Sequence, residues 1–298
     1  LMSTFDSYFR GRKDLFKGLA IEKLEKDWTE YPVLHFDLSD IKKGTVEDFG
    51  ENVNSSLASM EGEFGIAKTS DNPGTRLKDL VERIYNKTGK QVVLLFDEYD
   101  APLLTVLHDP ERLETMRTEL QSFYSPIKKL DPYLRFVFIT GITKFSQLSI
   151  FSQLNNLNNI SMLPQYAAMC GITIKELEDN FQEGIAVLAE KYHYSHKQVI
   201  DKLLYHYDGY HFAEDSEGVL NPFSLLSAMN NRKFNNYWFS TGTPTFLVNM
   251  MRKFHTDLTE IDGSKAMQED FDAPTENMHN VLPLFYQSGY LTIKDYNP

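Results

Sequence analysis

The stretch that decides the fold reads Lys90-Gln91-Val92-Val93-Leu94-Leu95-Phe96-Asp97-Glu98-Tyr99-Asp100. Five consecutive apolar residues in it lead to two adjacent carboxylates, those of Asp97 and Glu98. A strand that is apolar at every position has both faces covered, as in a parallel sheet between layers of helices. Ligands of such sheets bind at the carboxyl ends of the strands. The sequence therefore predicts that Asp97 and Glu98 lie at the mouth of a ligand site.

Two neighbouring acids after a buried strand are typical of a Walker B motif. In a P-loop ATPase the first acid helps to hold Mg²⁺ on the nucleotide phosphates, and the second can polarise the attacking water. We therefore expect Asp97 to bind the metal and the nucleotide, and Glu98 to act as the catalytic base. The alternative interpretation is a strand that ends in a solvated acidic turn.

Such a protein also has a Walker A loop, G-x-x-x-x-G-K-[ST], which holds the phosphates with its backbone N–H groups and its lysine. This sequence contains no such motif. Apolar residues at positions 2, 5 and 9 follow helical spacing, so residues 1–9 are predicted to be helical. A P-loop fold places a helix directly after the phosphate loop. We therefore expect the sequence to begin just after its Walker A loop. The competing interpretation is a degenerate fold that does not hydrolyse nucleotide.

Strand-like and helical segments alternate in the first half of the chain, which is typical of βα units and a parallel sheet. We expect strands at about 32–38, 91–96 and 134–139, and helices at about 46–60, 75–88 and 111–129. Asn72-Pro73-Gly74-Thr75 predicts a helix start, and Gly89 predicts its end. The predicted fold class is α/β, a P-loop NTPase-like parallel sheet flanked by helices.

From about residue 165 the sequence predicts a second, mostly helical domain. Helical segments are expected near 173–192, 195–207, 222–230 and 243–254, with one late strand near 289–294. A winged-helix-like ending is one arrangement for these last segments. We therefore divide the chain into an α/β domain, residues 1–164, and a helical domain, residues 165–298. The polar stretch 263–280 is expected to form a long loop.

A second group of candidate residues follows the strand at 134–139, in the segment Thr140-Gly141-Ile142-Thr143-Lys144. A polar or cationic group just past the strand beside Walker B can contact the γ-phosphate, because donors fixed in place stabilise charge that develops on the transferred group. We expect Lys144 to be a catalytic sensor of this kind, and Thr140 and Thr143 to contact the nucleotide. The alternative for Lys144 is an ordinary lysine in water.

Composition argues against several classes of protein. The chain has 298 residues, and 30 basic against 42 acidic side chains give a formal net charge of −12. This charge repels phosphate backbones, so we expect no direct binding of nucleic acid. The single cysteine, Cys170, fits a reducing compartment. The sequence shows no signal peptide and no span of about 18 apolar residues, so we expect a cytoplasmic protein with no membrane contact.

Two further clusters have ordinary explanations. His193, His196, His206 and His211 lack nearby thiols or carboxylates at zinc-site spacing, so we expect them on the surface or in packing roles. Aromatic residues are frequent between 205 and 239, where the local charge is not basic. We expect them to pack in the core or at a domain junction, and not to stack on bases.

Taken together, these segments resemble the AAA-ATPase-like proteins common in gut Bacteroidetes and other anaerobes. The similar segments are the Walker B run, residues 138–145, Tyr207-Asp208-Gly209-Tyr210-His211-Phe212, Asn221-Pro222-Phe223-Ser224, residues 237–244 and residues 287–293. In that family a motif like RPRRFGKS precedes a stretch similar to residues 1–9, and a PD-(D/E)XK nuclease-like domain usually follows. The resemblance covers nearly the whole chain, but neither of these two parts is in this sequence.

The resemblance implies an ATP-binding, ATPase-like regulatory core that uses ATP and Mg²⁺. Its nucleotide state would control a protein partner or a C-terminal nuclease-like module. We expect the chain by itself to bind Mg-ATP weakly or not at all, and to hydrolyse ATP once a Walker A segment is restored. Lys144 resembles a position where signal-transducing ATPases with numerous domains carry an arginine. The alternative function is a non-catalytic α/β module that binds a protein or peptide.

Overall fold

The structure, a computed structural model, divides the chain into two compact units. One consists of residues 1–157 and 267–279, and the other of residues 158–266 and 280–298. The predicted domain boundary between residues 164 and 165 stays a prediction. The residues that the structure describes are 1–41, 44–142, 156–207, 209–213, 216–238, 245–257, 259, 261, 263–271 and 280–295.

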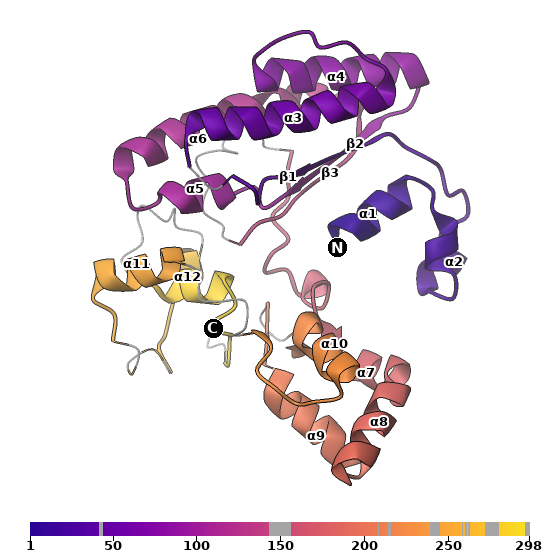
Figure 1. Ribbon diagram of the computed structural model, residues 1–298, viewed down its shortest axis with the longest axis vertical. Helices are drawn as coiled ribbons and strands as arrows, with labels where there is room; N and C mark the ends of the chain where they lie inside the picture. Colours follow the sequence, from indigo (N-terminus) through magenta and orange to yellow (C-terminus); the bar gives the residue numbers. More distant parts are fainter. Residues whose placement is uncertain are drawn as a thin grey trace. The chain divides into compact units, whose positions relative to one another are not determined.

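The first unit is built on a three-stranded parallel sheet of β1 (Val33–Asp37), β2 (Val92–Asp97) and β3 (Leu134–Ile139) (Figure 1). β2 is the central strand and pairs in parallel with both neighbours. All five residues from Val92 to Phe96 are buried, as expected for a strand with both faces covered. The predicted central parallel strand, its neighbour at 134–139 and the α/β fold class are confirmed.

Helices cover both faces of this sheet (Figure 1). One face carries α3 (Val46–Phe64), α4 (Pro73–Thr88) and α6 (Pro110–Tyr124), and the other carries α1 (Met2–Phe9). Phe36 of β1 stacks on Phe96 of β2 with ring centres 5.0 Å apart, and Phe123 of α6 contacts both rings edge-on. Such aromatic pairs add roughly 0.5–1.5 kcal/mol each beyond the area they bury, so this cluster fixes α6 on the sheet.

The starts of the long helices follow from local side-chain chemistry. The Thr45 side chain accepts the third N–H group of α3, that of Asp48, at 3.1 Å. The Asn72 side chain does the same for Thr75 of α4 at 2.9 Å, and α4 ends at Gly89, whose φ is +67°. Capping residues accept hydrogen bonds from N–H groups that have no partner within the helix. A glycine in the left-handed conformation is the usual residue at the C-terminal end of a helix. The predicted start and end of α4 are confirmed.

The direction of α1 bears on the function. Phe5 packs on Phe138 of β3 with ring centres 4.9 Å apart, and Phe9, one turn later, packs on Phe136 at 5.1 Å. The N–H of Tyr31, just before β1, donates to the carbonyl of Phe9 at 2.7 Å. α1 therefore runs antiparallel to the strands, and its first residues lie toward their carboxyl ends (Figure 1).

Shorter elements connect these parts: η1 (Lys13–Phe16), α2 (Ala20–Leu24), α5 (Ala101–Val106) and η2 (Ser125–Tyr133). The helix predicted over 111–129 is shorter, because α6 ends at Tyr124 and the chain continues as the 3₁₀ helix η2. Pro126 has no N–H group to donate to the preceding turn, so the α-helical hydrogen bonds cannot continue through it.

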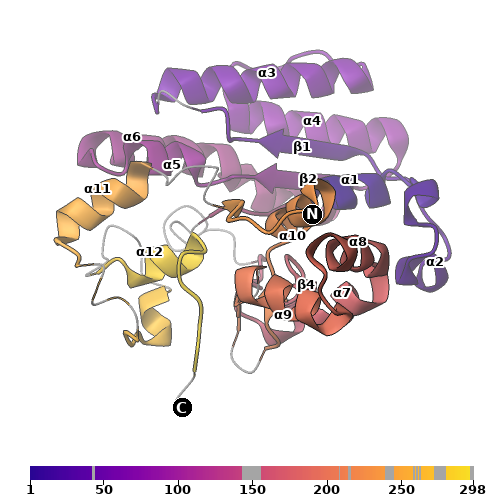
Figure 2. The same ribbon diagram turned by 60° about the horizontal axis from the view of Figure 1, so that its bottom comes forward.

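The second unit packs four helices around one core: α7 (Ile174–Asn180), α8 (Gln182–Tyr192), α9 (His196–Tyr207) and α10 (Pro222–Asn231) (Figure 2). A short antiparallel pair joins β4 (Ile172–Thr173) to β5 (Val219–Leu220). The single helix predicted over 173–192 is two helices separated at Phe181. At this break the side chain of Asn180 donates to the Glu176 carbonyl at 3.0 Å and competes with the helical backbone for it.

The remaining described elements are α11 (Thr245–Phe254), η6 (Gln268–Phe271) and α12 (Leu282–Gln287). The strand predicted near 289–294 is wrong. Gly289 has a φ of +79°, and the N–H groups of Tyr290 and Leu291 both donate to the Phe285 carbonyl, at 2.7 and 3.1 Å. These groups close α12 and cannot pair in a sheet, so a winged-helix-like ending has no strand here. None of the described helices has the length and apolar character to cross a membrane.

Candidate functional site

Acidic side chains gather where β1 and β2 end. Asp37 and Asp97 are the last residues of the two strands and are partners in the sheet register. The N–H of Leu38 donates to the Asp97 carbonyl at 3.1 Å, which continues the pairing by one residue. Asp97 is half-buried and Asp37 is exposed. The N-terminus of α1, where the helix dipole is positive, lies toward this same edge of the sheet.

Glu98 follows β2 in a backbone conformation that is rare for residues other than glycine. Its φ is +54°, in the left-handed region, and such strain costs roughly 1–3 kcal/mol and is concentrated at functional sites. The Glu98 N–H donates to the Asp97 carboxylate at 3.1 Å, and the Glu98 carbonyl accepts the N–H of Ala101 at 3.0 Å. These hydrogen bonds hold a tight turn between the end of β2 and the start of α5.

Glu98 also has an unusual affinity for its proton. Burial, followed by the charges of Asp100, Asp97 and Asp37, raises the pKa of Glu98 from 4.5 to about 7. All of these causes disfavour a further negative charge at this edge of the sheet. A carboxyl group with a pKa near neutrality can take up and release a proton at the pH of a cell, which is the property that a general base needs.

The described residues include no group of three or more His, Cys, Asp or Glu side chains that is arranged to hold a metal ion by itself. Mg²⁺ is usually held by one or two carboxylates together with waters and substrate phosphates, so it does not need such a group. The carboxylate of Asp97, at the end of the central strand, is a hard oxygen ligand of the kind that Mg²⁺ prefers. The edge of the sheet can therefore supply one metal ligand and a neighbouring base.

The turn after β3 lies beside these acids. The N–H of Thr140 donates to the Phe96 carbonyl at 2.9 Å, and the Thr140 carbonyl accepts the N–H of Tyr99 at 3.0 Å. The structure thus brings the predicted residues Asp97, Glu98 and Thr140 to one edge of the sheet. Thr143 and Lys144 lie outside the described residues.

Sequence reasoning missed two acids of this edge, Asp37 and Asp100. Asp37 could have been found, because it ends a predicted parallel strand and the carboxyl ends of parallel strands meet at one edge. Asp100 is fully buried, with no exposed surface. Nothing in the pattern of the sequence signals this, since an acid three residues past a strand is ordinarily solvated.

The raised pKa of Glu98 predicts a specific dependence of stability on pH in metal-free buffer. The folded state holds the Glu98 proton up to about pH 7, and the unfolded state only up to about 4.5. The contribution to stability is therefore present below 4.5 and lost as pH rises through about 7. At about 1.4 kcal/mol per pH unit, Glu98→Gln should gain up to roughly 3 kcal/mol on the parent between about pH 5 and about pH 8.

The two tryptophans, Trp28 and Trp238, allow this to be measured for the first unit alone. In a Trp238→Phe background, urea unfolding of the first unit is followed by the fluorescence of Trp28. Glu51→Gln, at an exposed position of α3, is the control and should keep a constant difference from the parent. A pH-independent difference for Glu98→Gln would contradict the raised pKa.

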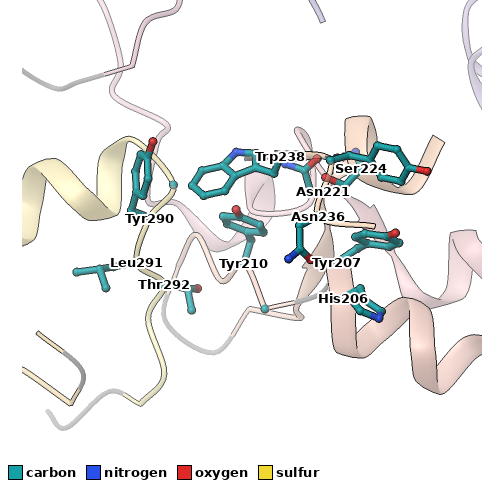
Figure 3. Close-up of a pocket in the computed structure, with 13 residues that line it drawn as sticks. His206, Tyr207, Tyr210, Asn221, Ser224, Asn236, Trp238, Tyr290, Leu291 and Thr292 are labelled. Atoms are coloured by element: carbon teal, nitrogen blue, oxygen red, sulfur yellow. Dashed lines mark hydrogen bonds between the residues drawn. The ribbon is translucent and has the colours of Figure 1, made fainter. Parts of the chain in front are cut away.

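A separate pocket lies within the second unit and has a volume of about 300 Å³ (Figure 3). Its lining consists of His206, Tyr207, Gly209, Tyr210, Asn221, Ser224, Asn236, Tyr237, Trp238, Gly289, Tyr290, Leu291 and Thr292. Trp238 and Tyr290 meet edge to face with ring centres 4.6 Å apart. No Asp, Glu, Lys or Arg is among the lining residues in the part of the chain that the structure describes. The pocket therefore suits an uncharged group that packs on aromatic rings and exchanges hydrogen bonds with amide and hydroxyl groups.

The sequence predicts that the aromatic residues near this pocket pack in a core or at a domain junction. Tyr207 is buried in the core of the unit, as predicted. Tyr205 is 81% exposed, so the prediction is wrong for it. Tyr210 and Trp238 are half-buried and line the pocket.

Comparisons with known proteins find a family model and a relative that match this chain. A family model described as "Predicted AAA-ATPase" matches residues 1–151, which contain β1, β2 and β3. A protein of Azotobacter chroococcum mcd 1, described as "Uncharacterized protein in vnfD 5'region", is 34% identical over 98% of this chain. The chain spans 54% of the length of that relative. No solved structure matches the chain.

The family match covers half of the chain and includes the whole acidic edge, Asp37, Asp97, Glu98 and Asp100. The similarity to the Azotobacter protein extends through both units. The chain belongs to the AAA-ATPase-like family.

Proposed function

We propose that the first unit binds Mg-ATP at the carboxyl edge of its sheet and hydrolyses it. The observation that carries the proposal is the Asp97–Glu98 pair at the end of a central, fully buried parallel strand, on the edge toward which α1 begins. A helix N-terminus is a natural site for phosphate, because free N–H groups and the helix dipole both favour negative charge. The family match supports an ATPase-like role.

The roles divide between the two acids. Asp97 would hold Mg²⁺, which when bound neutralises charge on the phosphates. Glu98, with its pKa near 7, would accept a proton from the attacking water. Successive residues that leave a strand point in different directions, so one acid could face the metal and the other the water. Thr140, Thr143 and Lys144, in the segment of the sequence that follows β3, would contact the phosphates.

Nucleotide binding should depend on a Walker A loop. We expect the chain of 298 residues to bind Mg-ATP weakly or not at all, and a version with a Walker A segment before Leu1 to bind it with micromolar affinity, because that loop makes the main phosphate contacts. We call this second form the Walker A version. Calorimetric titration with ATP, with and without Mg²⁺, measures both. Asp97→Ala should abolish the gain in affinity that Mg²⁺ gives.

The control for this experiment is Asp14→Ala, which removes an exposed acid of η1 that pairs with Arg12. It should leave the Mg²⁺ effect unchanged. A Walker A version without measurable ATP binding would contradict the proposed function, and so would an Mg²⁺ effect that survives Asp97→Ala.

The nucleotide cycle would act on something beyond this chain. We propose that it controls a protein partner or a nuclease-like module of a longer protein. The supporting observation is that the Azotobacter relative is about twice as long as the stretch it shares with this chain, which spans 54% of it.

A second function, a non-catalytic binding module, is favoured by the pocket of the second unit. The aromatic and amide groups among its described lining residues fit an uncharged side chain of a peptide. The titration above distinguishes the two functions, because a Walker A version that does not bind ATP would leave the binding module as the better explanation.

A further inference from the structure

The turns after β2 and β3 are joined by a buried carboxylate. Asp100 has no exposed surface, and its side-chain oxygen Oδ1 accepts the N–H of Ile142 at 3.1 Å. A parallel backbone hydrogen bond runs from the Tyr99 N–H to the Thr140 carbonyl at 3.0 Å. Two consecutive residues of the Walker B turn thus bind two residues of the neighbouring turn.

Gly141 shows how closely the two turns approach. A Cβ atom at this position would overlap the Asp100 carboxylate and would come within 2.7 Å of Cδ1 of Tyr99. Atoms that are not bonded do not approach this closely, so only glycine fits between Thr140 and Ile142 without displacing Asp100. The close approach of the two turns therefore depends on a glycine at position 141, beside Asp100.

The position of Asp100 makes this use of its side chain unexpected. Asp100 is the N-cap residue of α5, where an aspartate ordinarily accepts an N–H group of its own helix. Its side chain makes no such capping hydrogen bond. Instead, the carboxylate is directed to the turn after β3, at the cost of burying a charged group. Asp100 thus contacts the turn after β3 and does not cap its own helix. This indicates that its side chain serves to hold the two turns together.

We infer that Asp100 is a positioning residue that holds the Thr140–Ile142 turn against the turn that carries Glu98. The inference rests on the proposed ATPase function. Catalytic groups must keep their relative placement closely, and a misplacement of ~1 Å can cost ~10²-fold in rate. Asp100 would not touch nucleotide; it acts by fixing Thr140 relative to Glu98.

The test compares two substitutions in the Walker A version. Asp100→Ala should lower kcat for ATP roughly tenfold or more while KM changes less than about threefold, because positioning acts on the reacting geometry. Asp100→Asn retains an oxygen that can accept the Ile142 N–H and should restore most of kcat. Hydrogen exchange at the Ile142 amide, which needs no nucleotide, should be faster in Asp100→Ala and close to the parent in Asp100→Asn.

Glu61→Met is the matched control, since it removes another buried acid of the first unit whose partner is Arg76. Its kcat per folded molecule should equal that of the parent. If Asp100→Ala does not fold, Gly141→Ala tests the same contact from the other turn and should lower kcat in the same way.

Several results would overturn the inference: a parental kcat in Asp100→Ala or in Gly141→Ala, an equal loss in Asp100→Asn and Asp100→Ala, or an equal loss in Glu61→Met. The two proposals can fail separately. A Walker A version without ATPase activity removes the proposed function, whereas unchanged exchange at Ile142 in Asp100→Ala removes the role of Asp100 by itself.

Discussion

Glu98→Gln in the Walker A version is expected to lower ATP turnover by ~10²-fold or more while ATP stays bound, because general base assistance contributes on this scale. Glutamine has nearly the same shape as glutamate but cannot accept a proton from water. The substitution leaves Asp97 in place, so the affinity for Mg-ATP should be retained. Steady-state ATPase rates and equilibrium binding of Mg-ATP measure the two quantities separately.

Two comparisons sharpen this test. Glu51→Gln changes an exposed glutamate of α3 in the same way and should keep the parental rate. Asp97→Ala should lower the affinity for ATP in the presence of Mg²⁺. Glu98→Gln should instead lower the turnover and leave this affinity unchanged. Equal turnover in Glu98→Gln and the parent would remove Glu98 from the chemistry and favour the binding module.

The core of the first unit could be predicted because each feature has a local cause. The run from Val92 to Phe96 is apolar at every position, and a parallel sheet covered on both faces is the fold that buries such a strand. Asn72 and Gly89 mark the ends of α4 through capping chemistry that acts within a few residues. From these elements the placement of Asp97 at the edge of the sheet follows directly.

Other features could not be predicted because they depend on contacts between distant residues. The left-handed backbone of Glu98 is held by the turn between β2 and α5, and glutamate has no intrinsic preference for it. The burial of Asp100 depends on Gly141, in the turn that follows the neighbouring strand β3. Gly289 reads as part of a strand in sequence, yet its positive φ closes α12 together with the Phe285 carbonyl. In each case the conformation is decided by tertiary structure.

The buried pair of Arg76 and Glu61 also joins distant parts of the chain. Breaking this pair is the substitution from which we expect the largest loss of stability. The Nε and Nη2 atoms of Arg76 donate to the two Glu61 carboxylate oxygens, both at 2.6 Å, and Nη1 donates to the side chain of Asn54 at 2.8 Å. The side chains of Arg76 and Glu61 are only 3% and 8% exposed. The pair therefore links α4 to α3 in a setting that water does not reach.

Glu61→Met should destabilise the first unit by about 3–5 kcal/mol, because it leaves the Arg76 charge buried without its partner. Arg76→Met should cost a similar amount for the converse reason. The double substitution should cost less than either single one, since two apolar side chains need no compensation for lost hydration. Urea unfolding followed by Trp28 fluorescence in the Trp238→Phe background gives all the free energies of this cycle.

The ion pair of Lys78 and Glu82 on α4 is the natural control for this cycle. Its atoms are 3.4 Å apart, and its side chains are 38% and 32% exposed. Water already solvates both charges, so Glu82→Gln should cost less than about 1 kcal/mol. If Glu61→Met costs no more than Glu82→Gln, water reaches the Arg76 side chain and the close packing of α3 on α4 is wrong. A double substitution that costs the sum of the two single ones would likewise show that the two charges do not depend on each other.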